Sequence, residues 1–204
     1  MPDKLSEIAE TLYNSGCLKF GNFRIKSGAL SPYYIDLAFL LSSPKALCTV
    51  ADIAAEKIIQ IASTNRIDKL ATIELKGALI LPSIGCRTNL PCVIVRKEEK
   101  TYGATGRTAG AEVVKGEQLL FFDDVISEGL SKLEAIKPLE ELGANVENVL
   151  VVVDREQHGK ENLEKLGYKV HSLVKVGELT QRLLEGRKIS RDEANAVLDY
   201  VRRF

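Results

Sequence analysis

Two adjacent aspartates, Asp123 and Asp124, directly follow a run of apolar residues and precede a turn rich in small and hydroxyl side chains. Ser127, Gly129 and Ser131 lie in that turn, immediately before a helical pattern. Backbone N–H groups at a helix N-terminus bind phosphate, and carboxylates bind sugar hydroxyls or a metal ion. The segment therefore suits a sugar phosphate. Taken alone, it is equally compatible with a strand end whose aspartates and serine only cap the next helix.

A second segment, residues 97–117, is rich in glycine and has no hydrophobic period in its first half. Arg96, Lys97, Lys100 and Arg107 give it a high density of positive charge. A loop of this length inside a compact domain is uncommon and usually functional, so we interpret it as a functional loop. The alternative is a solvated hairpin or a disordered surface excursion.

Composition limits the class of protein. The 204 residues suffice for one large domain, and 28 basic against 28 acidic residues give a net charge of zero, which argues against a nucleic-acid binder. No apolar run approaches the roughly 18 residues of a membrane span, so no membrane association is expected. The four cysteines show no metal-binding spacing and predict reduced thiols, as in a cytoplasmic protein.

Alternating elements must position these chemical groups. From residue 66 onward, short apolar runs alternate with helical patterns, which predicts an α/β fold with a mostly parallel central sheet flanked by helices. The charged last helix is expected to present a solvated face. The expected strands are 70–73, 92–95, 119–122, 149–153 and 170–174, and the expected helices are 3–15, 43–61, 77–87, 131–142, 160–166, 177–185 and 190–203. Residues 18–36 are expected to form short strands and turns.

The segment FFDDVISEGLS (121–131) resembles the phosphoribosyl-pyrophosphate (PRPP) motif of type I phosphoribosyltransferases, in which an apolar strand precedes two acids and a hydroxyl-rich turn with glycine. Segments 18–36, 96–103 and 151–174 are similar to orotate phosphoribosyltransferases, particularly the form fused to a decarboxylase in UMP synthases. The four segments are in the family's order and are spread over residues 18–174 of the chain. The resemblance implies transfer of phosphoribose from PRPP to orotate, giving orotidine 5'-monophosphate and pyrophosphate in pyrimidine (UMP) biosynthesis.

The resemblance also implies a role for each matching residue. Asp124, Lys100 and Tyr102 match catalytic positions. Arg155 matches an arginine that pairs with the orotate carboxylate, a task suited to the guanidinium fork. The implied orotate site comprises Tyr34, Ile35, Ser127 and Arg155. The implied PRPP site comprises Lys26, Lys76, Arg96, Lys97, Lys100, Tyr102, Asp123, Asp124, Val125, Ile126, Ser127, Glu128, Gly129, Leu130 and Ser131.

Further expectations concern organisation and partners. The family implies a single domain, residues 1–204, with a small N-terminal hood (1–42) and an α/β core (43–204) carrying a mobile loop at 97–117. It implies Mg²⁺ held mainly through PRPP, with no protein metal site. It also implies a homodimer in which the 97–117 loop reaches the partner's site.

Two residues of the phosphate turn depart from the family pattern. Glu128 places a carboxylate where relatives have a small or hydroxyl residue, and Leu130 lacks a possible hydroxyl donor. These departures leave two alternatives to the transferase. One is a non-catalytic PRPP or nucleotide sensor that regulates a partner, and the other is a phosphoribosyltransferase for another base, such as a purine.

Overall fold

The computed structural model describes residues 3–25, 28–100 and 106–204. Its strands are β1 (Leu18–Arg24), β2 (Leu30–Ile35), β3 (Lys69–Ile73), β4 (Cys92–Lys100), β5 (Gly106–Gly110), β6 (Gln118–Ile126), β7 (Asn145–Asp154) and β8 (Lys169–Lys175). Its helices are α1 (Lys4–Asn14), the 3-10 helix η1 (Leu37–Ser42), α2 (Pro44–Ala62), α3 (Lys76–Thr88), α4 (Leu130–Glu141), α5 (Gly159–Glu164), α6 (Val176–Glu185) and α7 (Arg191–Val201).

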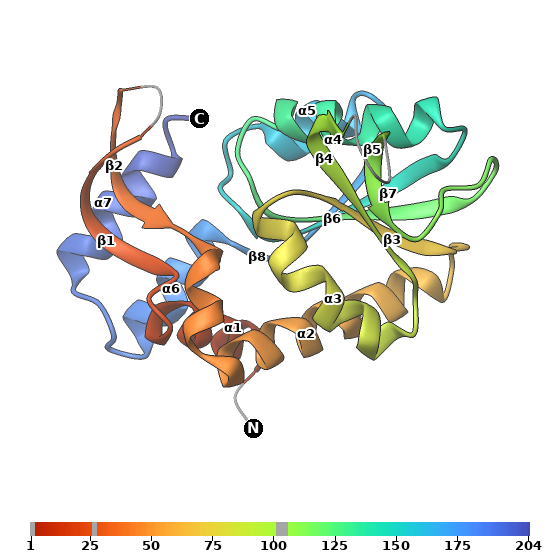
Figure 1. Ribbon diagram of the computed structural model, residues 1–204. Coiled ribbons are helices and arrows are strands. Elements are labelled where there is room, and N and C mark those ends of the chain that lie inside the picture. Colours follow the sequence, from red (N-terminus) through yellow and green to blue (C-terminus); the bar gives the residue numbers. More distant parts are fainter. Residues whose placement is uncertain (1–2, 26–27, 101–105) are drawn as a thin grey trace.

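The central sheet has six strands in the order β5-β4-β3-β6-β7-β8. Every neighbouring pair is parallel except β4–β5, which is antiparallel at one edge. Helices α4 and α5 cover one face, and α1, α2 and α3 lie on the other (Figure 1). The predicted fold class, a mostly parallel sheet flanked by helices, is confirmed.

Two hydrophobic cores lie on opposite faces of this sheet, because successive side chains of a strand point to opposite sides. Leu120 and Phe122 of β6 are buried in the core formed with α1, α2, α3 and α6. Leu119 and Phe121 of the same strand are buried in the core formed with α4 and α5. Strands buried on both faces read as continuous apolar runs, which is why the sequence revealed them.

The strand order reverses at β3, which lies between β4 and β6. The chain leaves β3 through α3 toward one face of the sheet and leaves β6 through α4 toward the other (Figure 1). In open α/β sheets, ligands bind beyond the carboxyl ends of the strands at such a reversal. The residues that follow β3 and β6 are therefore positioned to form a site.

The N-terminal hairpin packs with the C-terminal helices. Strands β1 and β2 are antiparallel, and Figure 1 shows them beside α7, away from the central sheet. Tyr33 of β2 and Tyr200 of α7 meet edge-to-face, with ring centroids 6.0 Å apart. Ala194 and Val197 of α7 are also buried, so the expectation of a solvated last helix is wrong for this face. The buried face of α7 is a narrow apolar stripe, and the charged residues on the rest of the helix hid it in the sequence.

In its described residues the segment 97–117 includes strand and is not one continuous loop, which corrects its expected conformation. Strand β4 extends to Lys100, and β5 pairs with it antiparallel, with Val95 opposite Thr108. The guanidinium Nη1 of Arg96 donates to the carbonyl of Gly106 at 2.8 Å. Backbone pairing at the sheet edge, which needs no apolar periodicity, holds these arms together. Residues 101–105, between the arms, lie outside the described residues.

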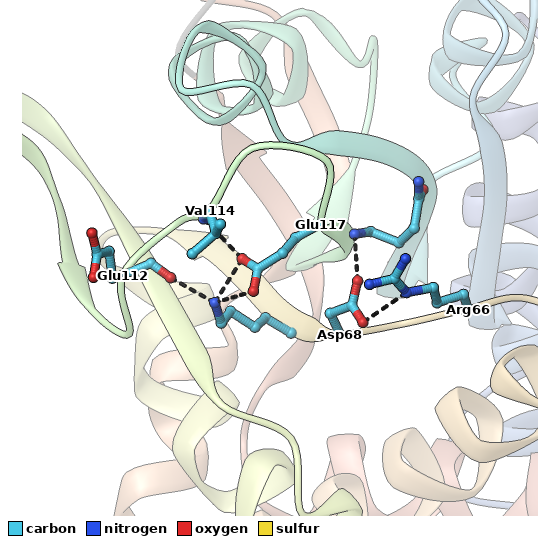
Figure 2. A network of polar contacts seen from close by, with 7 residues as sticks. Arg66, Asp68, Glu112, Val114 and Glu117 are labelled. Atoms are coloured by element: carbon cyan, nitrogen blue, oxygen red, sulfur yellow. Dashed lines mark hydrogen bonds and ion pairs between the residues drawn. The ribbon is translucent and has the colours of Figure 1, made fainter.

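A polar network anchors the chain after β5 to the start of β3 (Figure 2). The ammonium of Lys69 donates to the Glu112 carbonyl at 2.7 Å and to the Glu117 carboxylate at 2.6 Å. The same carboxylate accepts from the Val114 N–H, and these contacts, led by Lys69, lower the pKa of Glu117. Asp68 accepts from the backbone of Gln118, which joins β3 to β6. The network therefore fixes the end of the sheet at which β3 and β6 begin, opposite the carboxyl ends of these strands.

Among the described residues, no helix combines the length and the apolar character needed to cross a membrane.

Candidate active site

One cavity of about 440 Å³ lies at the carboxyl end of the sheet, facing the β1–β2 hairpin. Strand β6, the start of α3, the hairpin and the turn after β7 all contribute to its wall. Its lining residues are Arg24, Ile25, Tyr33, Tyr34, Ile35, Lys76, Asp124, Val125, Ser127 and Arg155. Seven of these ten were predicted as site residues from the sequence, from segments far apart in the chain.

Lys76 begins α3 at the carboxyl end of β3. The next residue, Gly77, fits closely against the sheet, because a Cβ there would lie 2.9 Å from the Asp123 carboxylate and still nearer the Thr72 hydroxyl. The Lys76 ammonium lies 3.2 Å from Asp36 and 4.0 Å from Asp124. Burial acts to lower the pKa of Lys76, but Asp124 and Asp36 outweigh it and raise that pKa. Lys76 is therefore cationic and faces the cavity.

The two predicted acids occupy different environments. Asp123 is buried, and its carboxylate pairs with the buried ammonium of Lys132 and accepts from the Asp124 N–H. Asp124 lines the cavity, and burial together with the neighbouring Asp123 raises its pKa to about 6. Lys132 and Lys76 act in the opposite direction on that pKa. A carboxyl group of this pKa exchanges a proton readily near neutral pH.

The turn at residues 127–129 joins β6 to α4 and contains Gly129 in a left-handed conformation (φ 88°). A Cβ on Gly129 would lie 3.0 Å from the Gly159 carbonyl, so the turn packs tightly against α5. Asn162 donates to the Glu128 carbonyl at 3.2 Å, whereas the Glu128 side chain is exposed. No side chain caps the N-terminus of α4 within the described residues. Its N–H groups are thus arranged as an anion seat requires.

Arg155 follows β7, and its side chain is held by Tyr33. The guanidinium Nε donates to the Tyr33 hydroxyl at 3.1 Å, and the guanidinium carbon lies 4.9 Å from the centre of the Tyr33 ring. The backbone N–H of Arg155 donates to the Ile126 carbonyl at 3.0 Å. Glu156 is held beside it by Asp154 and by the Gly177 N–H. Arg155 is therefore fixed from both backbone and side chain.

Tyr34 and Ile35 line the cavity as well. Tyr34 is partly exposed and packs on Phe23, with ring centroids 5.7 Å apart. A partly exposed aromatic ring in the cavity lining offers an apolar surface for a planar base.

Other predicted residues lie elsewhere or cannot be placed. Arg96 and Lys97 belong to β4 and do not line the cavity, although the Lys97 N–H donates to Glu74, two residues before Lys76. Lys26 and Tyr102 lie outside the described residues, and so does the side chain of Lys100. Ile126 is buried in the core beneath α4, so only its backbone faces the Arg155 turn.

Sequence reasoning missed several residues of this site. Tyr33 and Asp36 flank the predicted Tyr34 and Ile35, and only the register of β2 reveals which of them contact Arg155 and Lys76. Lys132 carried a signal that we did not use, since a lysine in the first turn of a half-buried helix needs a buried partner. Arg24 and Ile25, at the end of β1, also line the cavity.

No protein-family model matches the chain. The chain is 40% identical over 188 residues to the orotate phosphoribosyltransferase of Pyrococcus horikoshii, which covers 92% of this chain and 97% of that protein. It is 36% identical to the uridine 5'-monophosphate synthase of Bos taurus over 97% of this chain and 40% of that protein. The solved UMP synthase of Leishmania donovani superposes with a TM-score of 0.87 at 30% identity, covering 98% of this chain and 42% of that chain.

The fold, with two adjacent aspartates and the N-terminus of α4 at the strand-order reversal, is that of a type I phosphoribosyltransferase. The sequence relatives narrow this class. The chain belongs to the orotate phosphoribosyltransferase family.

Proposed function

We propose that this chain transfers the phosphoribosyl group of PRPP to orotate, giving orotidine 5'-monophosphate and pyrophosphate for pyrimidine (UMP) synthesis. The single observation that carries the proposal is that Lys76, Asp124 and Arg155 line one cavity beside the N-terminus of α4. Their charges match those of the two substrates. The cation suits pyrophosphate, the acid suits the ribose, and the guanidinium suits the orotate carboxylate.

In this mechanism the bond from the anomeric carbon to pyrophosphate breaks as the orotate nitrogen attacks that carbon. Positive charge develops on the ribosyl ring, as in glycoside hydrolysis. Asp124 stabilises that charge when ionised, and its pKa of about 6 also suits it to accept a proton from the acceptor base. Lys76 neutralises the departing pyrophosphate. The α4 N-terminus and the 127–131 turn hold the 5'-phosphate.

The donor set fits magnesium. Asp36 and Asp124 both offer carboxylate oxygens within 4.0 Å of the Lys76 ammonium. Mg²⁺ binds through one or two carboxylates plus substrate phosphates. Among the described residues, no group of three or more His, Cys, Asp or Glu side chains forms a metal cluster. Bound through PRPP, the ion would neutralise charge on the pyrophosphate. We propose that the metal arrives with PRPP.

The assay is direct. Purified chain, PRPP, Mg²⁺ and orotate are mixed, and the loss of orotate absorbance is followed. Turnover is expected. If calorimetry finds binding of orotate and PRPP without turnover, the chain is instead a sensor. The departure of Glu128 from the family pattern is the reason to consider that role. Turnover of a purine base in preference to orotate would overturn the choice of acceptor.

The remaining family properties belong to the same proposal. We propose a cytoplasmic homodimer of single-domain subunits, each with residues 1–42 as a hood on the 43–204 core, in which the 97–117 segment supplies Lys97, Lys100 and Tyr102 to the partner's site. Inactive Lys100→Ala and Asp124→Ala chains should regain activity when mixed under conditions that exchange subunits. Verified exchange without recovery would exclude a shared site.

A further inference from the structure

We propose that Tyr33 is a positioning residue for orotate, and that it acts by presenting the outer edge of the Arg155 guanidinium to the orotate carboxylate. This inference rests on the proposed function and deepens it. It assigns a role to a residue that does not itself need to touch the substrate.

The hydrogen bond between the two residues decides which donors of Arg155 are free. The guanidinium has five N–H donors, of which the one on Nε is directed to the Tyr33 hydroxyl at 3.1 Å. Within the described part of the chain, no other side-chain hydrogen bond and no ion pair involves Arg155. The Nη1 and Nη2 edge is therefore available, and it can receive both oxygens of one carboxylate.

Tyr33 suits this task because it is rigid and uncharged. Its side chain is fully buried, and Ser31 of the same strand donates to its carbonyl at 2.8 Å. Burial raises the pKa of Tyr33 and outweighs the opposing effect of Arg155, so the phenol stays neutral. A neutral hydroxyl orients the guanidinium without cancelling its charge. The bound carboxylate then meets an undiminished cation.

The C-terminal helix completes the arrangement. Tyr200 of α7 meets the Tyr33 ring edge-to-face at 6.0 Å and 85°, and Phe204 packs against Tyr200 at 5.5 Å. Three aromatic rings thus run from the end of the chain to Arg155. Their packing restricts Tyr33 to one position, because an edge-to-face contact has a preferred geometry.

The test compares Tyr33→Phe with a matched control. Tyr33→Phe keeps the ring that packs on Tyr200 and removes only the hydroxyl. Tyr13→Phe removes a hydroxyl that donates to the Lys188 carbonyl at 3.0 Å, outside the cavity lining. For each chain we would measure KM for orotate, KM for PRPP, kcat and the thermal midpoint. A second acceptor, uracil, is orotate without its carboxylate.

Tyr33→Phe should raise the orotate KM about tenfold, the usual effect of losing one hydrogen bond to a charged group, with the PRPP KM unchanged within about twofold. It should also reduce the preference in kcat/KM for orotate over uracil by about the same factor, because only orotate has the carboxylate. Tyr13→Phe should change neither quantity. A merely structural role would lower the thermal midpoint and affect both substrates equally.

An unchanged orotate KM in Tyr33→Phe, or an equal rise for orotate and PRPP, overturns the inference while leaving the proposed function intact. If the unmodified chain neither converts orotate nor binds it in calorimetry, the proposed function fails first, and the inference fails with it. If the chain binds orotate without turnover, the same comparison is made with dissociation constants in place of KM.

Discussion

The ammonium of Lys76 lies 4.0 Å from the carboxylate of Asp124, so the first residue of α3 faces the end of β6 across the strand-order reversal. Gly77 makes this approach possible, because any larger residue would collide with Thr72 and Asp123. In the proposed reaction the bond between the anomeric carbon and pyrophosphate breaks. Lys76 neutralises the departing pyrophosphate, and Asp124 stabilises the positive charge on the ribosyl ring.

Lys76→Ala should lower kcat by about 10²–10³, the typical loss when one pre-positioned charge is removed from an active site. The pKa of Asp124 should rise further, because Lys76 lowers it. Steady-state kinetics from pH 5 to 9 measure both effects. Lys45→Ala, an exposed lysine of α2 outside the cavity lining, is the control and should behave like the unmodified chain. Equal activity of the two variants would exclude Lys76 from the reaction.

The kcat/KM of the unmodified chain should decline as the pH falls below about 6, because Asp124 must be ionised to act and its pKa is raised to about 6. Asp124→Asn should be nearly inactive at every pH. A profile that stays flat from pH 8 to 5 would contradict an essential carboxylate at this position.

The raised pKa of Asp124 also predicts how the free energy of unfolding depends on pH. A carboxyl group whose pKa is raised in the folded state binds its proton more tightly there, so the free energy of unfolding falls as pH rises from about 4 through about 6. Above that range Asp124 opposes folding by up to about 3 kcal/mol, since one pKa unit corresponds to about 1.4 kcal/mol. Urea unfolding should therefore find Asp124→Asn more stable than the unmodified chain at pH 8, and equally stable at pH 4. A less stable variant at pH 8 would contradict the assignment.

Lys132→Met should destabilise the chain by about 3–5 kcal/mol, because it leaves the buried Asp123 carboxylate without its partner. The double variant Asp123→Asn, Lys132→Met should recover most of that stability, since it removes both buried charges. Urea unfolding at pH 7 measures all three chains. A double variant no more stable than Lys132→Met would show that the ion pair is not the source of the loss.

Glu128→Ser should lower the PRPP KM about two- to fivefold, because a weak, exposed like-charge repulsion of the 5'-phosphate disappears. The gain should shrink as salt is added, since salt screens exposed charges. Glu134→Ser, an exposed acid further along α4, is the matched control. A PRPP KM that rises in Glu128→Ser would mean that this carboxylate contributes to binding.

Much of this architecture was predictable from local patterns. The β6 run and the acids after it were evident because a strand buried on both faces is uniformly apolar. The β4–β5 hairpin was not, because antiparallel pairing at a sheet edge leaves no hydrophobic period in residues 97–110. The apolar face of α7 was hidden by its many charged neighbours. The contacts that bury this face are distant in sequence, since Tyr200 of α7 packs on Tyr33 of β2.

Part of the site was also predictable from local sequence motifs. Lys76, Asp124 and Arg155 carry motifs, and the fold brings them to one cavity. Tyr33 was missed because the choice between adjacent tyrosines depends on strand register, which a sequence alone leaves open. The sequence signal of Lys132 did not name its partner, because Asp123 lies in the preceding strand and the contact forms only when α4 packs on the sheet.

We propose that Arg155 binds orotate while Lys76, Asp124 and the α4 N-terminus bind PRPP. The most direct measurement is the pair of Michaelis constants for Arg155→Ala. The orotate KM should rise about 30- to 100-fold, as expected for the loss of a two-pronged charged contact, with the PRPP KM changed by no more than about twofold. Equal changes in the two constants, or a rise in the PRPP KM alone, would contradict the account.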